Sequence, residues 1–177
     1  MGIETLNGYS EKENIVYKYK LLAVVTLLTI AVQPSFADNH GQIIGVWKMV
    51  SFEWEIKDSG DRVFPWGMTP TGYLIYTPEG RMMTITTKES REPPVTTQDR
   101  ANLFNSMSAS TGMYNLEEDK LVIKIDNAWD PALIGTERIS FIKFDGDRLQ
   151  VTSDWMPAGA GSTGSMGRSI ITWERVK

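Results

Sequence analysis

The sequence contains no cysteine and only one histidine, His40, in a chain of 177 residues. The absence of cysteine excludes disulfide bonds, thiolate metal sites, iron–sulfur clusters and cysteine nucleophiles. A single imidazole excludes a cluster of histidine metal ligands and argues against a serine–histidine–acid triad. We therefore predict no metal site, no cofactor and no catalytic residue, and we expect His40 to be a solvated residue near the start of the mature chain.

The chain also lacks a strongly basic segment. Its formal net charge is −4, and no long run of lysine or arginine occurs. Because phosphate backbones are bound by clustered cations, we predict no nucleic-acid partner. The length and the 41% hydrophobic content are typical of one globular domain.

One apolar run stands apart from the rest of the chain. Leu21–Val32 holds twelve residues without a charge, Lys18 and Lys20 precede it, and Ser35 and Ala37 follow it. A basic flank, a short apolar core and small residues after it are typical of a secretory signal peptide. As a helix the run would span about 18 Å, which is short of a hydrocarbon core of about 30 Å. We expect cleavage after residue 37, no stable membrane anchor afterwards, and a periplasmic or secreted protein.

Alternation of apolar and polar residues dominates the remaining sequence. Along Val46–Ile56, Phe52 and Trp54 fall on one face of an extended strand, and Trp47 and Met49 fall on the other. The turn at 77–80 combines proline at its second position with a glycine, which is typical of a hairpin. Several short strands with closely spaced turns predict an all-β domain, either an antiparallel barrel or a sandwich. The further strands are predicted at 72–76, 81–87, 112–116, 121–126, 138–144, 149–153 and 169–176.

Three segments fall outside the strand pattern. Thr97–Met107 is predicted to be one short helix with Thr97 as its N-cap. Residues 38–42 are predicted to be a flexible N-terminal tail. Gly159–Gly164 matches the spacing G-x-G-x-x-G, but a strand rather than a helix is predicted after it. We interpret this last segment as a flexible loop and not as a phosphate-binding site.

Large aromatic side chains are numerous, with six tryptophans, six tyrosines and six phenylalanines. Most of them are expected to fill the core. Trp66, Trp129 and Trp155 lie near proline- and glycine-rich loops at the ends of predicted strands. Large rings on such loops are typical of the rim of an apolar pocket.

Three separated segments, together with Gly135 and Arg138, follow one pattern. The segments are Gly45–Phe52, which opens on Gly-x-Trp, then Pro70–Met82, and finally Thr172–Val176. This pattern resembles the lipocalin-like domain family of the calycin superfamily over nearly the whole chain after the leader. The resemblance implies an up-and-down β-barrel of about eight strands over residues 43–177, with an interior cavity and a small apolar ligand.

The resemblance also implies how the barrel is closed. The indole of Trp47 would close one end beneath an arginine from late in the chain, for which Arg175 is the candidate and Arg168 the alternative. If Trp47 faces inward, strict alternation places Met49 and Ser51 inside with it and leaves Phe52 and Trp54 outside.

From these observations we hypothesise an exported barrel that binds a small hydrophobic or amphipathic molecule. Arg138 is the one cation expected near the interior, where it would pair with an acidic headgroup or with a buried acid such as Glu53. The predicted ligand-binding residues are Trp47, Met49, Trp66, Tyr73, Met83, Tyr114, Trp129, Arg138 and Trp155.

Two alternatives remain open at this point. One is a barrel enzyme of the isomerase or cyclase type, and the other is a structural or assembly protein of the cell envelope. Glu53 and Glu55 stand two apart on one predicted strand, and we interpret them as a solvated edge and not as a catalytic pair. The groups considered for the enzyme are Tyr73, Tyr114, Lys124, Asp126, Glu53 and Arg138.

Overall fold

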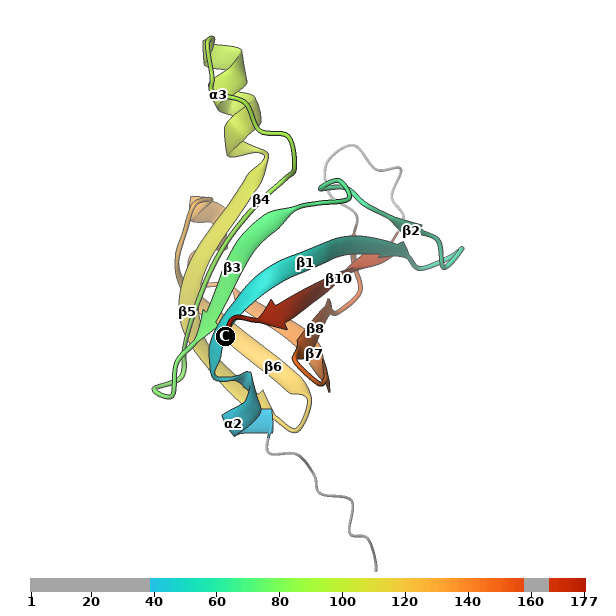
Figure 1. The fold of residues 1–177 in the computed structure, drawn as a ribbon, viewed down its shortest axis with the longest axis vertical. Helices are drawn as coiled ribbons and strands as arrows, with labels where there is room; N and C mark the ends of the chain where they lie inside the picture. Colours follow the sequence, from blue (N-terminus) through green and yellow to red (C-terminus); the bar gives the residue numbers. More distant parts are fainter. Residues whose placement is uncertain (1–38, 158–165) are drawn as a thin grey trace, which may run out of the picture. The chain divides into compact units, whose positions relative to one another are not determined.

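The computed structural model describes residues 39–157 and 166–177 of the chain (Figure 1). Strands form most of this part, and the helices are short. Among the described helices, none has the length and hydropathy needed to cross a membrane. The elements are α2 (Asn39–Ile43), β1 (Gly45–Ile56), β2 (Arg62–Val63), β3 (Thr71–Tyr76), β4 (Arg81–Thr87), α3 (Thr97–Phe104), β5 (Met107–Glu117), β6 (Lys120–Ala128), η1 (Pro131–Leu133), β7 (Glu137–Asp145), β8 (Arg148–Ser153), β9 (Met156–Pro157) and β10 (Met166–Arg175).

The strands close into one antiparallel barrel. Eight of them pair in the order β1, β3, β4, β5, β6, β7, β8 and β10, and β10 pairs with β1 to complete the circle. The two-residue strands β2 and β9 extend the pairing of β1 and β10. Because neighbours in the chain are neighbours in the barrel, the topology is up-and-down, and the barrel is confirmed in place of the sandwich.

The predicted strands and the hairpin between β3 and β4 are present. The Thr77 amide donates to the Arg81 carbonyl at 2.9 Å. Gly80 has a φ of +84°, a conformation that glycine adopts without a steric cost. Most strands extend beyond the predicted bounds because pairing with neighbours continues past the apolar core residues, and β5 in particular begins at Met107.

The helix α3 is shorter than predicted. Its N-cap is Thr96 and not Thr97, and a capping box joins Thr96 to Asp99. The helix ends at Phe104 because Met107 already pairs with Thr87 as the start of β5. In Figure 1, α3 stands off the end of strands β4 and β5.

The segment predicted to be a flexible tail is a helical turn where the structure describes it. Asn39–Ile43 forms α2, the Asn39 side-chain amide donates to the Glu118 carbonyl at 2.8 Å, and Ile43 is buried. An apolar residue at the end of the segment therefore fixes it against the barrel. The expected cleavage site and the glycine-rich segment at 159–164 lie outside the described residues.

Strand β1 changes its inward face along its length. Trp47 and Met49 are buried, and the register with β10 then shifts between Met49 and Ser51, which marks a β-bulge. Beyond this bulge Phe52 and Trp54 line the interior. The expectation that Ser51 faces inward and Phe52 and Trp54 outward is therefore wrong, because one extra residue reverses the alternation.

Candidate functional site

One end of the barrel is closed by Trp47, which is fully buried. Its indole N–H donates to the Ile43 carbonyl at 2.9 Å, and the Arg175 guanidinium lies 4.2 Å from the ring centroid. Arg175 also donates to the carbonyls of Ile44, at 3.0 Å, and of Gln42. The predicted pairing of Trp47 with Arg175 is confirmed, and Arg168 lies elsewhere, bonded to Glu55.

Close packing at the closed end explains why the first residue of the Gly-x-Trp triplet is a glycine. Gly45 has a φ of +140°, and a Cβ on it would lie 2.7 Å from Nη1 of Arg175. A side chain would therefore displace the guanidinium that covers Trp47. Glycine allows the backbone to pass beneath the arginine.

Beyond the closed end the barrel encloses a cavity of about 660 Å³. This volume lies within the range of small-molecule sites in proteins, roughly 300–1,000 Å³. The side chains next to the closed end are apolar, which makes this part of the wall suited to a hydrocarbon or ring. They are Met49, Leu74, Tyr76, Met82, Ile123, Ile125, Ile171 and Trp173.

Small hydroxyl side chains form much of the remaining wall: Thr84, Thr86, Ser108, Ser110, Thr136, Ser140, Ser153 and Ser169. The hydroxyls of Thr84, Thr86, Thr136 and Ser153 donate to backbone carbonyls. Those of Ser108, Ser110, Ser140 and Ser169 have no hydrogen bond to any described residue. This half of the wall therefore offers unused donors and acceptors to a bound molecule.

Arg138 also lines the cavity. In the pairing of β6 with β7, Arg138 lies opposite Ile123, which is buried. Because cross-strand partners lie on the same face of a sheet, the Arg138 side chain leaves β7 on the inward face. It has no ion pair or hydrogen bond among the described residues. The alternative in which Arg138 pairs with Glu53 is wrong, because Glu53 lies on the outer face, 3.0 Å from Arg62.

Two buried side-chain polar atoms have no hydrogen-bond partner among the described residues, Oε1 of Gln42 near the closed end and the indole N–H of Trp173 on the cavity wall. The Tyr76 hydroxyl makes no hydrogen bond either, and burial, together with the nearby Tyr114, raises the pKa of Tyr76 well above its usual value. Tyr76 therefore stays neutral and can donate to a ligand at physiological pH.

Aromatic side chains gather at the opposite end of the cavity from Trp47. Trp54, Trp66 and Trp155 all line it, and the rings of Phe52 and Trp66 lie 5.2 Å apart. The Arg168 guanidinium lies 4.5 Å from the Trp155 ring, and the Lys57 ammonium lies 5.6 Å from it. The two cations fix Trp155 by contact with its π-face.

The loop that carries Trp66 is tied to the connection between β4 and α3. The Glu89 carboxylate accepts from the amide of Thr69 at 2.9 Å and from its hydroxyl at 3.0 Å, and the Glu89 amide donates to the Trp66 carbonyl at 3.1 Å. These bonds from Thr69 hold the pKa of Glu89 below its usual value. They position Trp66 over the cavity.

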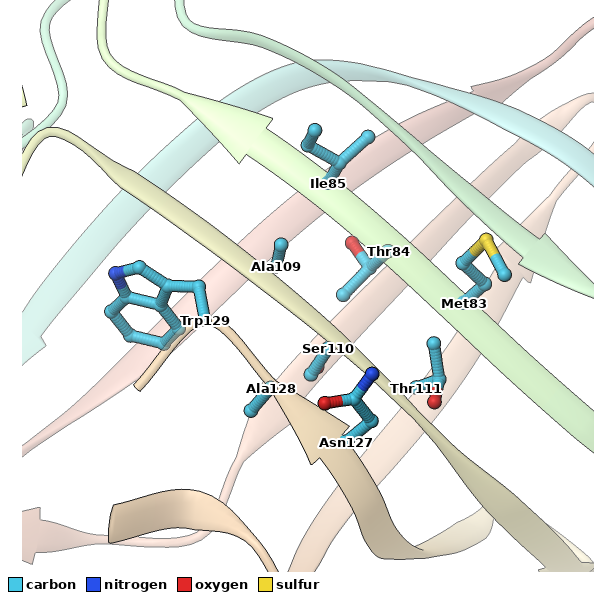
Figure 2. Close-up of a pocket in the computed structure, with 9 residues that line it drawn as sticks. All are labelled: Met83, Thr84, Ile85, Ala109, Ser110, Thr111, Asn127, Ala128 and Trp129. Atoms are coloured by element: carbon cyan, nitrogen blue, oxygen red, sulfur yellow. The ribbon is translucent and has the colours of Figure 1, made fainter. Parts of the chain in front are cut away.

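Four of the predicted ligand-binding residues lie away from the cavity. Tyr73 and Met83 point outward because they alternate with the buried Leu74 and Met82. Tyr114 packs in the closed end, where its hydroxyl donates to the Thr77 carbonyl at 3.0 Å. Trp129 lies with Met83 along a groove on the outer surface, which Figure 2 shows. The other five, Trp47, Met49, Trp66, Arg138 and Trp155, close or line the interior.

Phe52, Trp54 and the hydroxyl side chains line the cavity but were not predicted to do so from the sequence. The change of apolar face along Val46–Ile56 was a signal for the bulge that turns both rings inward. The alternation of Thr84 and Thr86 with apolar residues on β4 was a weaker signal, because threonine is common on both faces of strands.

The groups considered for catalysis are dispersed. Asp126 is on the outer surface, where it accepts from Arg81 at 2.7 Å and from Thr111 at 2.5 Å, and these bonds lower its pKa. Lys124 is exposed on the same strand. Glu53 and Glu55 are not a solvated edge as expected, because both are largely covered and Arg62 lies within 3.8 Å of each.

Comparison with known proteins gives a family and two distant structures. The model of a family described as a lipocalin-like domain matches residues 44–176. The structure of EF1p2_mFAP2b bound to DFHBI matches with 14% identity and a TM-score of 0.45, over 80% of this chain and all of that one. An uncharacterized protein from Bacteroides eggerthii DSM 20697 matches with 11% identity and a TM-score of 0.36, over 76% of this chain and 99% of that one. A search of the curated proteins finds no match.

Proposed function

This chain belongs to the lipocalin-like domain family, and from that premise we propose that it binds a small amphipathic molecule inside its barrel. The observation that carries the proposal is a cavity wall that is apolar next to Trp47, carries hydroxyl side chains further along, and ends in aromatic rings opposite Trp47. An apolar body gains about 25 cal/mol for each Å² that it buries, whereas a polar group needs hydrogen-bond partners. The bound molecule would therefore place its apolar part next to the closed end and its polar group beside the hydroxyl side chains.

The unpaired cation gives the proposal a chemical preference. Arg138 has no partner among the described residues, and unbonded serine hydroxyls line the same cavity. A carboxylate or a similar anion would accept charge-assisted hydrogen bonds from Arg138. We therefore expect an acidic amphiphile to bind more tightly than a neutral one with the same apolar body.

Paired titrations test this preference. Dodecanoate and dodecanol are added to the protein, and intrinsic tryptophan emission is followed to saturation, with micromolar dissociation constants expected for dodecanoate. Arg138→Met should weaken dodecanoate binding about tenfold and leave dodecanol binding unchanged, because only the anion uses the guanidinium. Arg148→Met, which removes an exposed arginine from β8, is the matched control. If no apolar or amphipathic probe gives a saturable change, the binding function is wrong and a structural role in the envelope takes its place.

The carboxyls whose pKa is lowered lie away from the cavity. Among the described carboxyls, those whose pKa is lowered are Glu79, Glu89, Asp99 and Asp126, and none of them lines the cavity. Their pKa values are set by hydrogen bonds at turns, caps and outer strands. The carboxylates that do line the cavity are Glu137 and Asp154, and Asp154 accepts from the Trp155 amide at 2.7 Å.

We also propose that residues 1–37 are a cleaved signal peptide and that the protein works in the periplasm or outside the cell. The support is the sequence pattern alone: a basic flank, the apolar run Leu21–Val32, then Ser35 and Ala37. N-terminal sequencing of the exported protein should begin at Asp38 or within a few residues of it. Recovery of an intact Leu21–Val32 segment in the membrane fraction would contradict this proposal.

A further inference from the structure

The outer surface of the barrel is apolar over two neighbouring strands. Tyr73, Met83 and Ile85 point outward from β3 and β4 and are 45%, 49% and 50% exposed, and Ile75 stands beside them. Tyr73 pairs with Ile85, and Ile75 pairs with Met83, so the four side chains form one continuous block. We call this block the ridge. The outward positions of β8 are instead Arg148, Gln150 and Thr152, as expected for a strand that faces water.

A groove of about 430 Å³ runs beside the ridge (Figure 2). Its floor is Ala109 and Thr111 on β5, which pair with Ile85 and Met83 of the ridge. Asn127, at the end of β6, and Trp129, which directly follows β6, form its far side. The small side chains of β5 leave the hollow open between the larger side chains on the two neighbouring strands.

The far wall of the groove is held in place. The Trp129 indole N–H donates to the Phe104 carbonyl at 3.2 Å, and the two rings lie 6.0 Å apart. Phe104 itself is 48% exposed and continues the apolar surface past Trp129. The groove is therefore a preformed feature, which favours a rigid partner over a segment that must first fold.

A ridge and a groove that lie side by side are complementary to a second copy of the same face. Rotation about a two-fold axis places the ridge of each copy in the groove of the other, which is the arrangement of an isologous dimer. From this geometry we propose that the face formed by β3, β4, β5 and the end of β6 is the interface of a homodimer. The proposal does not depend on the ligand, because the ridge residues point away from the cavity.

The charges on this face are compatible with a second copy of the chain and not with an anionic membrane surface. The arginine at the edge of the face, Arg81, is neutralised by Asp126 at 2.7 Å, so two copies can meet there without opposing like charges. A phosphate-rich membrane surface would require clustered cations, and the ridge and groove residues carry none. Met113, at 45% exposure, and Phe104, at 48%, extend the apolar surface beyond the ridge and the groove.

Sedimentation velocity of the protein with its natural N terminus, from about 1 to 100 µM, tests the proposal, and we expect a dimer at the upper end of this range. The double substitution Met83→Lys and Ile85→Lys should raise the dimer dissociation constant at least about 30-fold, since it brings four cations into the contact. The matched control is Phe141→Lys with Thr152→Lys, a cross-strand pair on the outer face of β7 and β8, in which Phe141 is 43% exposed. This control should change the dissociation constant less than about twofold. Circular dichroism checks that both variants keep the fold.

A cross-linking experiment tests the register, because the chain has no cysteine of its own. Copies with Met83→Cys, mixed with copies with Ala109→Cys, should form a disulfide-linked pair on mild oxidation. Copies with Met83→Cys mixed with Phe141→Cys should not. A monomer at every concentration, or equal dissociation of both double variants, would overturn the proposal. So would a monomer that floats with phosphatidylcholine–phosphatidylglycerol vesicles, because the face would then contact lipid.

Discussion

The tryptophan and the arginine that close one end of the barrel are hydrogen-bonded, whereas several polar groups on the cavity wall are not. At the closed end, the Trp47 indole and the Arg175 guanidinium are both bonded to backbone carbonyls, and the arginine covers the ring. In the cavity, Arg138 and four serine hydroxyls are unbonded among the described residues. Groups with satisfied hydrogen bonds stabilise a fold, and groups with unused hydrogen bonds are available to a ligand. We therefore expect the closed end to stabilise the fold and the cavity to bind the ligand.

The largest expected effect is on the closed end. Trp47→Ala should lower the free energy of unfolding by about 3–5 kcal/mol, because it removes a fully buried ring and leaves a cavity. Trp129→Ala, on the outer surface, should cost about 1 kcal/mol. Urea unfolding measures both. Equal midpoints for the two variants would remove the special role of the closed end.

The arginine over Trp47 should have a smaller effect in the same direction. Arg175→Met removes the contact at 4.2 Å and the bonds to the Gln42 and Ile44 carbonyls, so we expect a loss of about 2 kcal/mol. Arg148→Met, an exposed arginine from β8, should change the free energy of unfolding by less than about 0.5 kcal/mol. If both substitutions cost the same, Arg175 does not act through Trp47.

At the aromatic end of the cavity, a substitution should weaken binding and leave stability nearly unchanged. Trp155→Ala removes a ring from the cavity wall and should raise the dissociation constant for dodecanoate about tenfold, with a small change in melting temperature. Met83→Glu, on the outer face, should leave the dissociation constant unchanged. Tryptophan emission titrations and thermal unfolding of both variants test the separation. A loss of binding in Met83→Glu would show that the ligand contacts the outer surface.

The smallest effect concerns pH. Hydrogen bonds from Thr69 lower the pKa of Glu89 in the folded protein. A lowered pKa stabilises the folded state above the unfolded pKa of about 4.3, and this contribution is lost as the pH falls through the folded value. Between about pH 3 and 6, the free energy of unfolding should therefore depend less on pH in Glu89→Gln than in the unsubstituted protein. In Glu92→Gln its pH dependence should be unchanged. If the two pH profiles are identical, the Glu89 carboxylate does not hold the Trp66 loop.

The closed end could be predicted from the sequence, and much of the cavity could not. Gly45, Trp47 and Arg175 belong to short motifs at the two ends of the domain, and the family pattern joins them. The inward turn of Phe52 and Trp54 depends on a bulge, whose position is set by pairing with a strand more than a hundred residues away. Alternation along one strand cannot locate such a bulge, although apolar residues on both faces of β1 indicate one.

Tyr73, Met83 and Trp129 were assigned to the ligand site for a related reason. Large apolar residues were interpreted as part of the pocket, yet pairing in register places them on the outer surface with Ile85. Tyr73 and Met83 are 45% and 49% exposed, and this outward apolar surface is the basis of the proposed dimer. A large apolar side chain in the sequence indicates that the residue is in an apolar contact. The strand register is needed to tell whether it faces the core, the cavity or the outer surface.

Native mass spectrometry of the protein purified from its own host tests whether the barrel holds a ligand. We expect a species heavier than the chain by one small amphipathic molecule. This molecule should be retained in Met83→Glu and lost in Ser140→Phe, which fills the cavity from the hydroxyl-rich wall. The bare chain mass alone, with no uptake of dodecanoate afterwards, would contradict the claim that the open part of the barrel is a binding site.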